Sequence, residues 1–409
     1  MSWVHGILGL VVFYLLAWGL SENRKHASLK IVLLGVFWQF VFALILLKVP
    51  VITEIFQWIN QGVVAITAAT QKAMGFMFGG LATSPEGSHL GFILAFQALP
   101  VLIVISALSA LLFHWRILPL IIRVFSWLFQ KTLRIGGTLG IAAAANVFIG
   151  MNESPLVIRP YLKRLTHSEL FSLMVCGMAG VAGTVMVLYA SIVGPLIPNV
   201  IGHVITAVLI SVPAALTVSR VMVPETETIS VGGQAEFAKA ASTLDAISVG
   251  IMDGAKVLVT VIAMLVGFLA LIYLLNMALG LLPHFEGQAL SMQRVLGWIM
   301  SPIAWLMGVP WHEAQAAGSL LGTKMILNEV VAYGELVRIG AELSPKVQLM
   351  MLYALCGFAN LGSIGIMIGI YGSLVPERRQ EVTRLGVKAV IAGTLSTCMT
   401  GTIVGMLYV

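Results

Sequence analysis

The chain has 409 residues, of which 59% are hydrophobic and only 10% are charged, and its mean hydropathy is +1.00. A soluble domain carries about 25% charged residues, so this composition excludes an ordinary soluble enzyme and predicts an integral membrane protein. The formal net charge of +6 is too modest to indicate a nucleic-acid-binding surface. We therefore expect the lipid bilayer, and no nucleic acid, as a partner.

Apolar runs of about 17–25 residues are long enough to cross the hydrocarbon as helices. The chain has runs of this kind throughout its length, which predicts an all-α membrane protein with about eight transmembrane helices. The second and fifth runs give the weakest signal. The runs cover residues 5–20, 31–47, 91–113, 169–192, 199–219, 256–281, 347–372 and 386–408.

Basic residues indicate the orientation of the chain. Arg24, Lys25 and Lys30 lie between the first two runs, and Arg378, Arg379 and Arg384 lie between the last two. Under the positive-inside rule both loops are cytoplasmic, so an even number of spans places both termini on the outside or in the periplasm. The first run lacks a basic start and a cleavage pattern, so we expect a retained helix rather than a signal peptide.

Two segments combine apolar, aromatic and basic residues in a way that differs from the eight runs. Residues 116–131 and 291–309 have the composition of helices that lie along the membrane surface. The alternative is a pair of loop helices packed on the protein. Each segment precedes an Asn-Glu pair by a similar distance, which favours the interfacial interpretation.

The two Asn-Glu segments, residues 136–162 and 312–336, are too polar and too rich in glycine to cross lipid as simple helices. Irregular backbone is tolerated at membrane depth only where protein or a water-filled cavity surrounds it. A re-entrant hairpin meets this condition. We therefore predict two re-entrant hairpins, one in each half of the chain.

A repeated motif follows each hairpin. Residues 176–183 read Cys-Gly-Met-Ala-Gly-Val-Ala-Gly, and residues 356–363 read Cys-Gly-Phe-Ala-Asn-Leu-Gly-Ser. The first lies 23 residues after Glu153 and the second 27 residues after Glu329. Inverted-repeat transporters bind solutes between broken helices from two related halves, so the repeat predicts this architecture. The alternative is close helix packing through small residues.

These features divide the chain into four regions. Residues 1–90 form N-terminal scaffold helices, including a semi-polar, outside-facing helix and loop over 48–88. Residues 91–220 contain a scaffold helix and then the first half, namely interfacial helix, hairpin, broken helix and span. A polar linker covers 221–250, and 251–409 repeats the order of 91–220.

The two glutamates are the leading functional candidates, because carboxylates within the membrane are rare and costly. Apart from Arg159, we expect no lysine or arginine in the hairpins to neutralise Glu153 or Glu329. Both could accept hydrogen bonds from a hydroxylated solute or hold a proton; the alternative is helix capping by the Asn-Glu pairs. Asn360 and Ser363, with Phe358 beside them, offer partners for a sugar, although Asn360 alone is more typical of a satisfied polar group at a kink.

Enzymatic chemistries find no support in the sequence. His312-Glu313 begins like a zinc-protease motif but lacks the second histidine, and the chain contains neither a Walker phosphate loop nor a nucleophile elbow. The three cysteines lie in apolar stretches without metal-binding spacing. We therefore expect no enzyme, cofactor or metal centre.

Three of these stretches resemble the signatures of the concentrative nucleoside transporters: residues 150–155, residues 328–333 and residues 356–363. The resemblance runs from about residue 91 to the C-terminus. It implies eight spans, two re-entrant hairpins, a homotrimer and import of nucleosides by cation symport with an elevator movement. It further implies that Glu329, Asn360 and Ser363 hold the ribose next to Phe358, that Met151, Asn152 and Glu153 face the base, and that Asn146 with the Ile149 and Val181 carbonyls binds the cation.

Two departures from the family pattern affect these expectations. Met151 replaces a glutamine, so the base is read differently, because a thioether is only a weak acceptor. Gly180 replaces a residue with a hydroxyl in sodium-coupled members, which slightly favours H+ over Na+ as the coupling ion, with Glu153 as the proton carrier. The alternatives are a carrier of a modified nucleoside or nucleobase on the same scaffold and, less favoured, a passive channel or a receptor that transports nothing.

Overall fold

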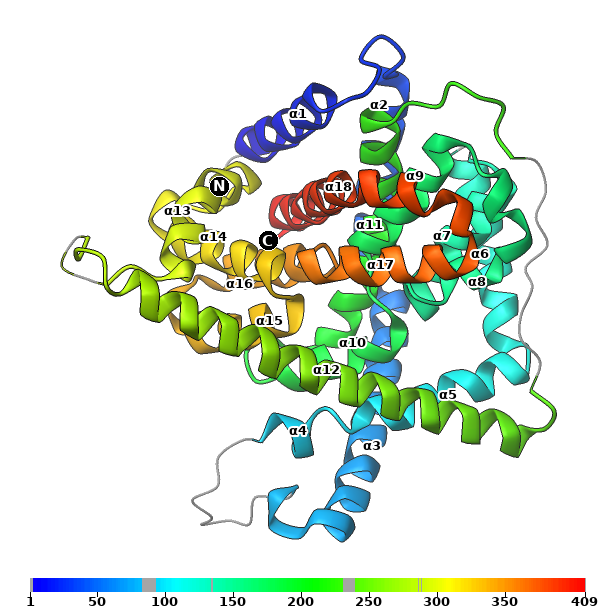
Figure 1. Cartoon of the computed structure of the whole chain (residues 1–409), viewed down its shortest axis with the longest axis vertical. Helices are drawn as coiled ribbons and strands as arrows, with labels where there is room; N and C mark the ends of the chain where they lie inside the picture. The colour runs from blue at the N-terminus through cyan, green and yellow to red at the C-terminus, as the bar shows by residue number, and fades with distance from the viewer. Residues whose placement is uncertain are drawn as a thin grey trace.

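The computed structural model describes residues 3–82, 93–133, 135–230, 240–285, 287 and 289–408. Every regular element in this part of the chain is a helix, which confirms the all-α prediction. Figure 1 shows a group of closely packed central helices, with other helices along the outside of the molecule.

The N-terminal region forms helices that pack on both halves of the repeat. α1 lies against α13 and α18, and α2 lies against α11. The segment predicted as a semi-polar helix and loop is mostly one long helix, α3, and residues 83–92 lie outside the described residues. The elements are α1 (Trp3–Gly19), α2 (Leu29–Lys48), α3 (Pro50–Phe78), η1 (Gly79–Leu81), α4 (Leu94–Gln97) and α5 (Val101–His114), and the packing partners are α11 (Val200–Met222), α13 (Met292–Met307) and α18 (Arg379–Leu407).

The two halves of the repeat contain the same series of elements. In each half a helix of the predicted interfacial segment is followed by a hairpin, a broken helix and a further span. The first half has α6 (Ile117–Leu133), α7 (Gly137–Ile149), α8 (Ser154–Val157), η2 (Arg159–Arg164), α9 (His167–Ala179), α10 (Gly183–Val193) and then α11. After the separate helix α12 (Thr243–Leu279), the second has α13, α14 (Trp311–Ile326), α15 (Glu329–Ile339), η3 (Gly340–Glu342), α16 (Pro345–Leu355), α17 (Leu361–Leu374), η4 (Pro376–Arg378) and then α18.

The predicted membrane spans coincide with helices wherever the structure describes them, and residues 91–92 of the third span lie outside the described residues. Among the described residues, six helical stretches are long and apolar enough to cross a membrane: 29–48, 94–114, 167–193, 200–222, 243–279 and 376–407. The first predicted span is the shorter helix α1, and the seventh is divided between α16 and α17. The weakly predicted second and fifth spans are the regular helices α2 and α11. Part of the polar linker, residues 231–239, lies outside the described residues.

Both repeated motifs interrupt a helix, as predicted. α9 ends at Ala179 and α10 begins at Gly183, while α16 ends at Leu355 and α17 begins at Leu361. The second interruption is the longer one, and Asn360 caps the helix that follows it: its side chain accepts a hydrogen bond from the backbone N–H of Ser363, at 2.8 Å. The broken helices therefore follow directly from the duplicated sequence.

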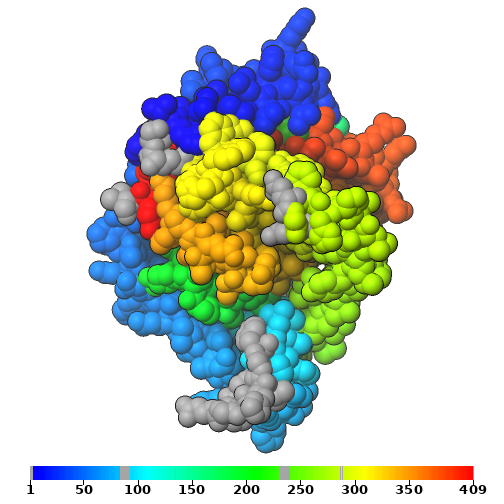
Figure 2. All heavy atoms as spheres, turned by 90° about the vertical axis from the view of Figure 1, so that its left-hand side faces the viewer, coloured from blue at the N-terminus to red at the C-terminus, as the bar shows by residue number. Residues whose placement is uncertain are grey.

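Burial separates central helices from peripheral ones. The apolar windows of α9–α10, α11 and α18 are 83%, 89% and 89% buried, whereas those of α2 and α12 are only 17% and 11% buried. α12 runs obliquely along the outside of the molecule next to α5 (Figures 1 and 2). Gly250 and Gly254 allow this close approach, because a Cβ there would lie 2.7 and 2.6 Å from the Cα atoms of Ala107 and Ile103.

A polar cluster joins three segments at one end of the bundle. His167, at the start of α9, places Nδ1 2.7 Å from Oε1 of Glu381 and Nε2 3.2 Å from Oε2 of Glu22. The Nζ of Lys388 donates to Glu22 at 2.8 Å, and Arg378 donates to the carbonyl of Leu165 at 2.6 Å. The two basic loops predicted to face the same compartment therefore lie at the same end of the molecule.

The dependence of folding stability on pH, in the acidic range, tests the contacts of Glu22. Burial alone would raise the pKa of Glu22, but the hydrogen bond and charge of Lys388, followed by those of His167, hold it below its usual value. A lowered folded-state pKa stabilises the protein above the unfolded-state pKa, and this contribution is lost as the pH falls through the folded-state value. Because the pair is partly exposed, we expect Glu22→Gln to cost about 0.2–1 kcal/mol at neutral pH.

The measurement is thermal unfolding of the purified protein as a function of pH, with Glu54→Gln on the exposed face of α3 as the control. The melting temperature of Glu22→Gln should lie below that of the wild type at neutral pH and converge with it in acid, below the folded-state pKa. An equal loss in both variants, or a difference that persists in acid, would contradict this role.

Candidate functional site

The tip of the first hairpin is pressed against the first helix break. Gly150 ends α7 with φ of 81°, a conformation that favours glycine, and a Cβ at this position would lie 2.5 Å from the Cβ of Ala182. Met151, which follows, is buried, and its Cβ lies 2.9 Å from where a Cβ of Gly177 would stand. The glycines of the motif thus make room for the hairpin tip.

The second hairpin turns through its Asn-Glu pair. Asn328 is the N-cap of α15, and its Oδ1 accepts a hydrogen bond from the backbone N–H of Val331 at 3.0 Å. Helix capping, the alternative considered from the sequence, is therefore correct for Asn328. Glu329 is the first residue of the helix and remains available for another role.

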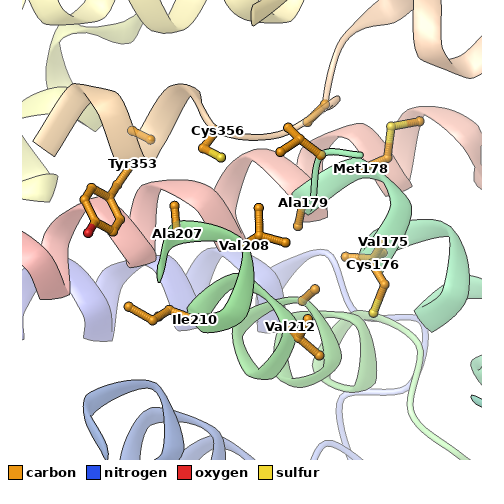
Figure 3. Packing of buried hydrophobic residues seen from close by; sticks show 14 of the residues in the cluster. Val175, Cys176, Met178, Ala179, Ala207, Val208, Ile210, Val212, Tyr353 and Cys356 are labelled. Atoms are coloured by element: carbon orange, nitrogen blue, oxygen red, sulfur yellow. The ribbon is translucent and has the colours of Figure 1, made fainter. Parts of the chain in front are cut away.

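The two helix breaks contact each other directly. The backbone N–H of Phe358, in the second break, donates to the carbonyl of Gly180, in the first, at 3.2 Å. A Cβ on Gly357 would lie 3.0 Å from the carbonyl oxygens of both Met178 and Ala179. Figure 3 shows the end of α9 and the chain around Cys356 in one tightly packed region, together with α11. The two motifs meet inside the protein.

Glu329 lies buried next to this region. Only 4% of the residue is exposed, and its Oε1 accepts a hydrogen bond of 2.9 Å from the hydroxyl of Tyr189 on α10. Its Oε2 has no hydrogen-bond partner among the described residues. Since an unpaired buried acceptor is costly, the free oxygen is suited to a donor supplied by a solute.

The second break places the other predicted sugar ligands. Asn360 and Ser363 are both buried, and Phe358 is partly buried against the core. The amide oxygen of Asn360 caps α17, as noted above, which leaves its NH2 group to act as a donor. No direct hydrogen bond joins either residue to Glu329 in the described part of the chain.

The polar residues of the first hairpin tip have different surroundings. Asn152 and Glu153 are exposed, whereas Met151 is buried. Glu153 interacts electrostatically with Asp253 of α12. The structure therefore does not bring Glu153 and Glu329 into contact, although the sequence motif treats them as equivalent.

Asn146 forms the centre of the predicted cation site. It is buried, and its Nδ2 donates to the carbonyl of Cys176 at 2.8 Å. Its Oδ1 has no partner among the described residues. Gly180 leaves room for this amide, because a Cβ there would lie 2.8 Å from Asn146 Nδ2. Ile149 and Val181 are buried at the adjoining end of α7 and in the break.

No group of three His, Cys, Asp or Glu side chains that could hold a metal ion occurs within the described ranges. The chemistry available at Asn146 is therefore that of amide and carbonyl oxygens. Oxygens of this kind, at unwound helix ends, bind coupling ions in transporters.

Sequence reasoning missed two residues around Glu329. It expected no basic residue near the hairpin glutamates apart from Arg159, and this was wrong: Lys324 is fully buried and interacts electrostatically with Glu329. The rule that charged residues inside a membrane are functional candidates would have identified Lys324. Tyr189, in an apolar helix outside the repeated motif, gave no comparable signal.

Models of one protein family match almost the whole chain. "Na+ dependent nucleoside transporter N-terminus" matches residues 8–81, "Nucleoside recognition" matches 95–196, and "Na+ dependent nucleoside transporter C-terminus" matches 203–405. The chain belongs to the concentrative nucleoside transporter family. The resemblance stated from the sequence motifs is thereby confirmed, and the family is one of transporters.

Related transporters support the assignment over the full length. The chain is 38% identical to "Uncharacterized transporter YutK" of Bacillus subtilis, over 99% of this chain and 100% of the relative. It is 35% identical to "Nucleoside permease NupC" of Helicobacter pylori, over 99% and 98%. A solved structure, "CNTnw in an inward-facing substrate-bound state", is 36% identical with a TM-score of 0.90, over 98% of both chains.

Tyr189 offers a test of how this transporter holds Glu329. Tyr189→Phe removes the hydroxyl that donates to Oε1, and a hydrogen bond to a charged group contributes about 1.5–3 kcal/mol. We expect nucleoside affinity to fall by about tenfold or more, as measured by uridine binding to the purified protein.

Tyr14→Phe is the matched control, because its buried hydroxyl bonds Gln39 on α2 at 3.2 Å and lies on another helix. Wild-type affinity in Tyr189→Phe would show that the hydroxyl does not position Glu329.

Proposed function

We propose that this protein is a secondary active transporter that imports nucleosides by cation symport. The observation that carries this proposal is the buried Glu329, which has one free carboxylate oxygen beside two helix breaks that contact each other. A carrier needs such a site near the middle of the membrane, between its two halves. The family assignment and the name of the Helicobacter pylori relative support nucleosides as the solute.

The ribose is assigned to the second half of the repeat. Glu329 accepts hydrogen bonds from its hydroxyls, Asn360 donates through its NH2 group, and Ser363 supplies a hydroxyl, while the Phe358 ring packs beside the sugar. The base is assigned to Met151, Asn152 and Glu153. Because Met151 is buried and apolar, it packs against the base instead of reading its polar edge.

The coupling cation is assigned to Asn146 and to the carbonyls of Ile149 and Val181. Sodium is the first candidate, because the matching family models are described as Na+ dependent and Asn146 Oδ1 is a buried acceptor without a partner among the described residues. The proton is favoured by Gly180, which offers no side-chain oxygen, and by the carboxylate of Glu153. The slight preference for the proton drawn from the sequence therefore stays a prediction.

Transport by an elevator movement requires a fixed frame and a moving body. The peripheral α5 and α12 are suited to the frame, because they pack closely on each other and α12 is mostly exposed. The hairpins and broken helices form the moving body. The packing of α1 and α2 on repeat helices favours moving them with this body, although the sequence division placed residues 1–90 in the scaffold.

We further propose a homotrimer in a bacterial inner membrane, with both termini in the periplasm.

A second candidate function is transport of a modified nucleoside or a nucleobase by the same sites. The apolar Met151, where the family pattern has glutamine, motivates it. Competition of labelled uridine uptake by nucleosides, free bases and ribose separates the candidates: competition by a base alone would favour the second. Accumulation against a concentration gradient excludes a passive channel.

The ribose assignment is tested with Glu329→Gln. The neutral amide is a weaker acceptor, and loss of a charged hydrogen bond costs about 1.5–3 kcal/mol, so gradient-driven uridine uptake into vesicles should fall by at least about tenfold. Glu335→Gln is the control, because Glu335 lies on the same helix and pairs with Arg338. Unimpaired uptake by Glu329→Gln would refute the ribose role.

The coupling ion is tested at Gly180. Gly180→Ser adds an oxygen beside Asn146, and Gly180→Ala adds the same Cβ without it. If sodium is coupled, the serine variant should lower the half-saturating sodium concentration by roughly fivefold, or about 1 kcal/mol, relative to the alanine variant. Uptake that follows pH in both variants and ignores replacement of sodium by choline would establish the proton instead.

A further inference from the structure

Lys324 is a fully buried lysine, and among the described residues no carboxylate forms an ion pair with it. It lies in the last turn of α14, and its Nζ donates to the carbonyl of Ala354 at 2.8 Å and to the hydroxyl of Thr397 at 2.9 Å. Lysine is almost never fully buried unless it is paired. Both identified partners are uncharged oxygens, and these are the ligands that transporters offer to a bound cation.

The position of Lys324 corresponds to that of Asn146 in the other half. Asn146 lies in the last turn of the first arm of hairpin one and donates to the carbonyl of Cys176, near the end of α9. Lys324 lies in the last turn of the first arm of hairpin two and donates to the carbonyl of Ala354, near the end of α16. Each half thus joins a hairpin to the C-terminal end of a broken helix through one polar side chain.

These two positions differ in charge. The C-terminal end of a helix carries a partial negative charge, which favours a cation. Next to Asn146 this end is approached by a neutral amide, with its oxygen free for an ion. Next to Ala354 the cation is already present as the ammonium of Lys324. The ammonium also lies within electrostatic range of Glu329, five residues further along the chain.

We propose that Lys324 is a tethered cation: in the second half it takes the place that the mobile coupling cation takes in the first, and it positions Glu329 for the ribose. This inference rests on the proposed function. It predicts that the cation position of the ribose half is always filled, by the ammonium of Lys324, whereas the half containing Asn146 must bind an ion from solution. Lys324 acts through Glu329 and is therefore a positioning residue, not a ligand of the nucleoside.

The test replaces the tethered cation with a diffusible one. Lys324→Ala leaves space beside Ala354 and Thr397 that methylammonium fits. In the purified variant we expect uridine affinity to be at least about tenfold weaker than in the wild type. Methylammonium chloride should increase the uridine affinity of this variant several-fold, and in the absence of nucleoside it should raise the melting temperature. Choline chloride at the same concentration should do neither. Wild type and Lys346→Ala, a control on α16, should not respond to methylammonium.

Each outcome bears on a separate claim. A folded Lys324→Ala that binds uridine as tightly as the wild type, or that responds equally to methylammonium and choline, overturns the tethered cation. If Lys324→Ala does not fold, Lys324→Arg decides: it keeps the charge and should bind uridine within about threefold of wild type, and a folded arginine variant without binding overturns the proposal. If the wild type itself binds no nucleoside, the proposed function fails, while the methylammonium melting shift still tests the tether.

Discussion

The hydrogen bond from the backbone N–H of Phe358 to the carbonyl of Gly180 holds the two interrupted helices together. Backbone groups released by unwinding a helix inside a membrane must find partners within the protein, and here each break supplies one for the other. The bond also places the two candidate sites close together in space, although they lie far apart along the chain. Gly180 adjoins the amide of Asn146, and Phe358 lies two residues from Asn360. Both candidate sites therefore adjoin the same short piece of irregular backbone.

The two halves share an order of elements but differ in their side chains. Asn328 caps a helix in the second hairpin, whereas its counterpart Asn152 is exposed. Asn360 caps α17, the helix that follows the second break, while the corresponding Gly180 has no side chain and leaves room for Asn146. The backbone of the repeat thus supplies a common framework, and a few substitutions give the two halves different polar side chains at equivalent places.

Much of this architecture could be predicted from the sequence because its signals are local. Apolar runs, glycine spacing and the duplicated motif identified the spans, the hairpins and both helix breaks. The surroundings of Glu329 could not be predicted in this way. Tyr189 reaches Glu329 from another helix, which no local pattern indicates. Lys324 lies in the same hairpin as Glu329, but the repeated motif relates the two glutamates to each other and not to this lysine. The different exposure of Glu153 and Glu329 depends on how the hairpins pack, which the motif does not specify.

The long outer helix α12 also provides a reference for depth. Its first part carries Asp245, Asp253 and Lys256, whereas residues 257–279 carry no charge and, at about 1.5 Å per residue, match the thickness of the hydrocarbon. Glu153 interacts with Asp253, so the first hairpin tip lies level with the charged part. A movement of the tip along α12 toward its uncharged part would take Glu153 away from Asp253, so the outer helix itself can report how far the hairpin has moved.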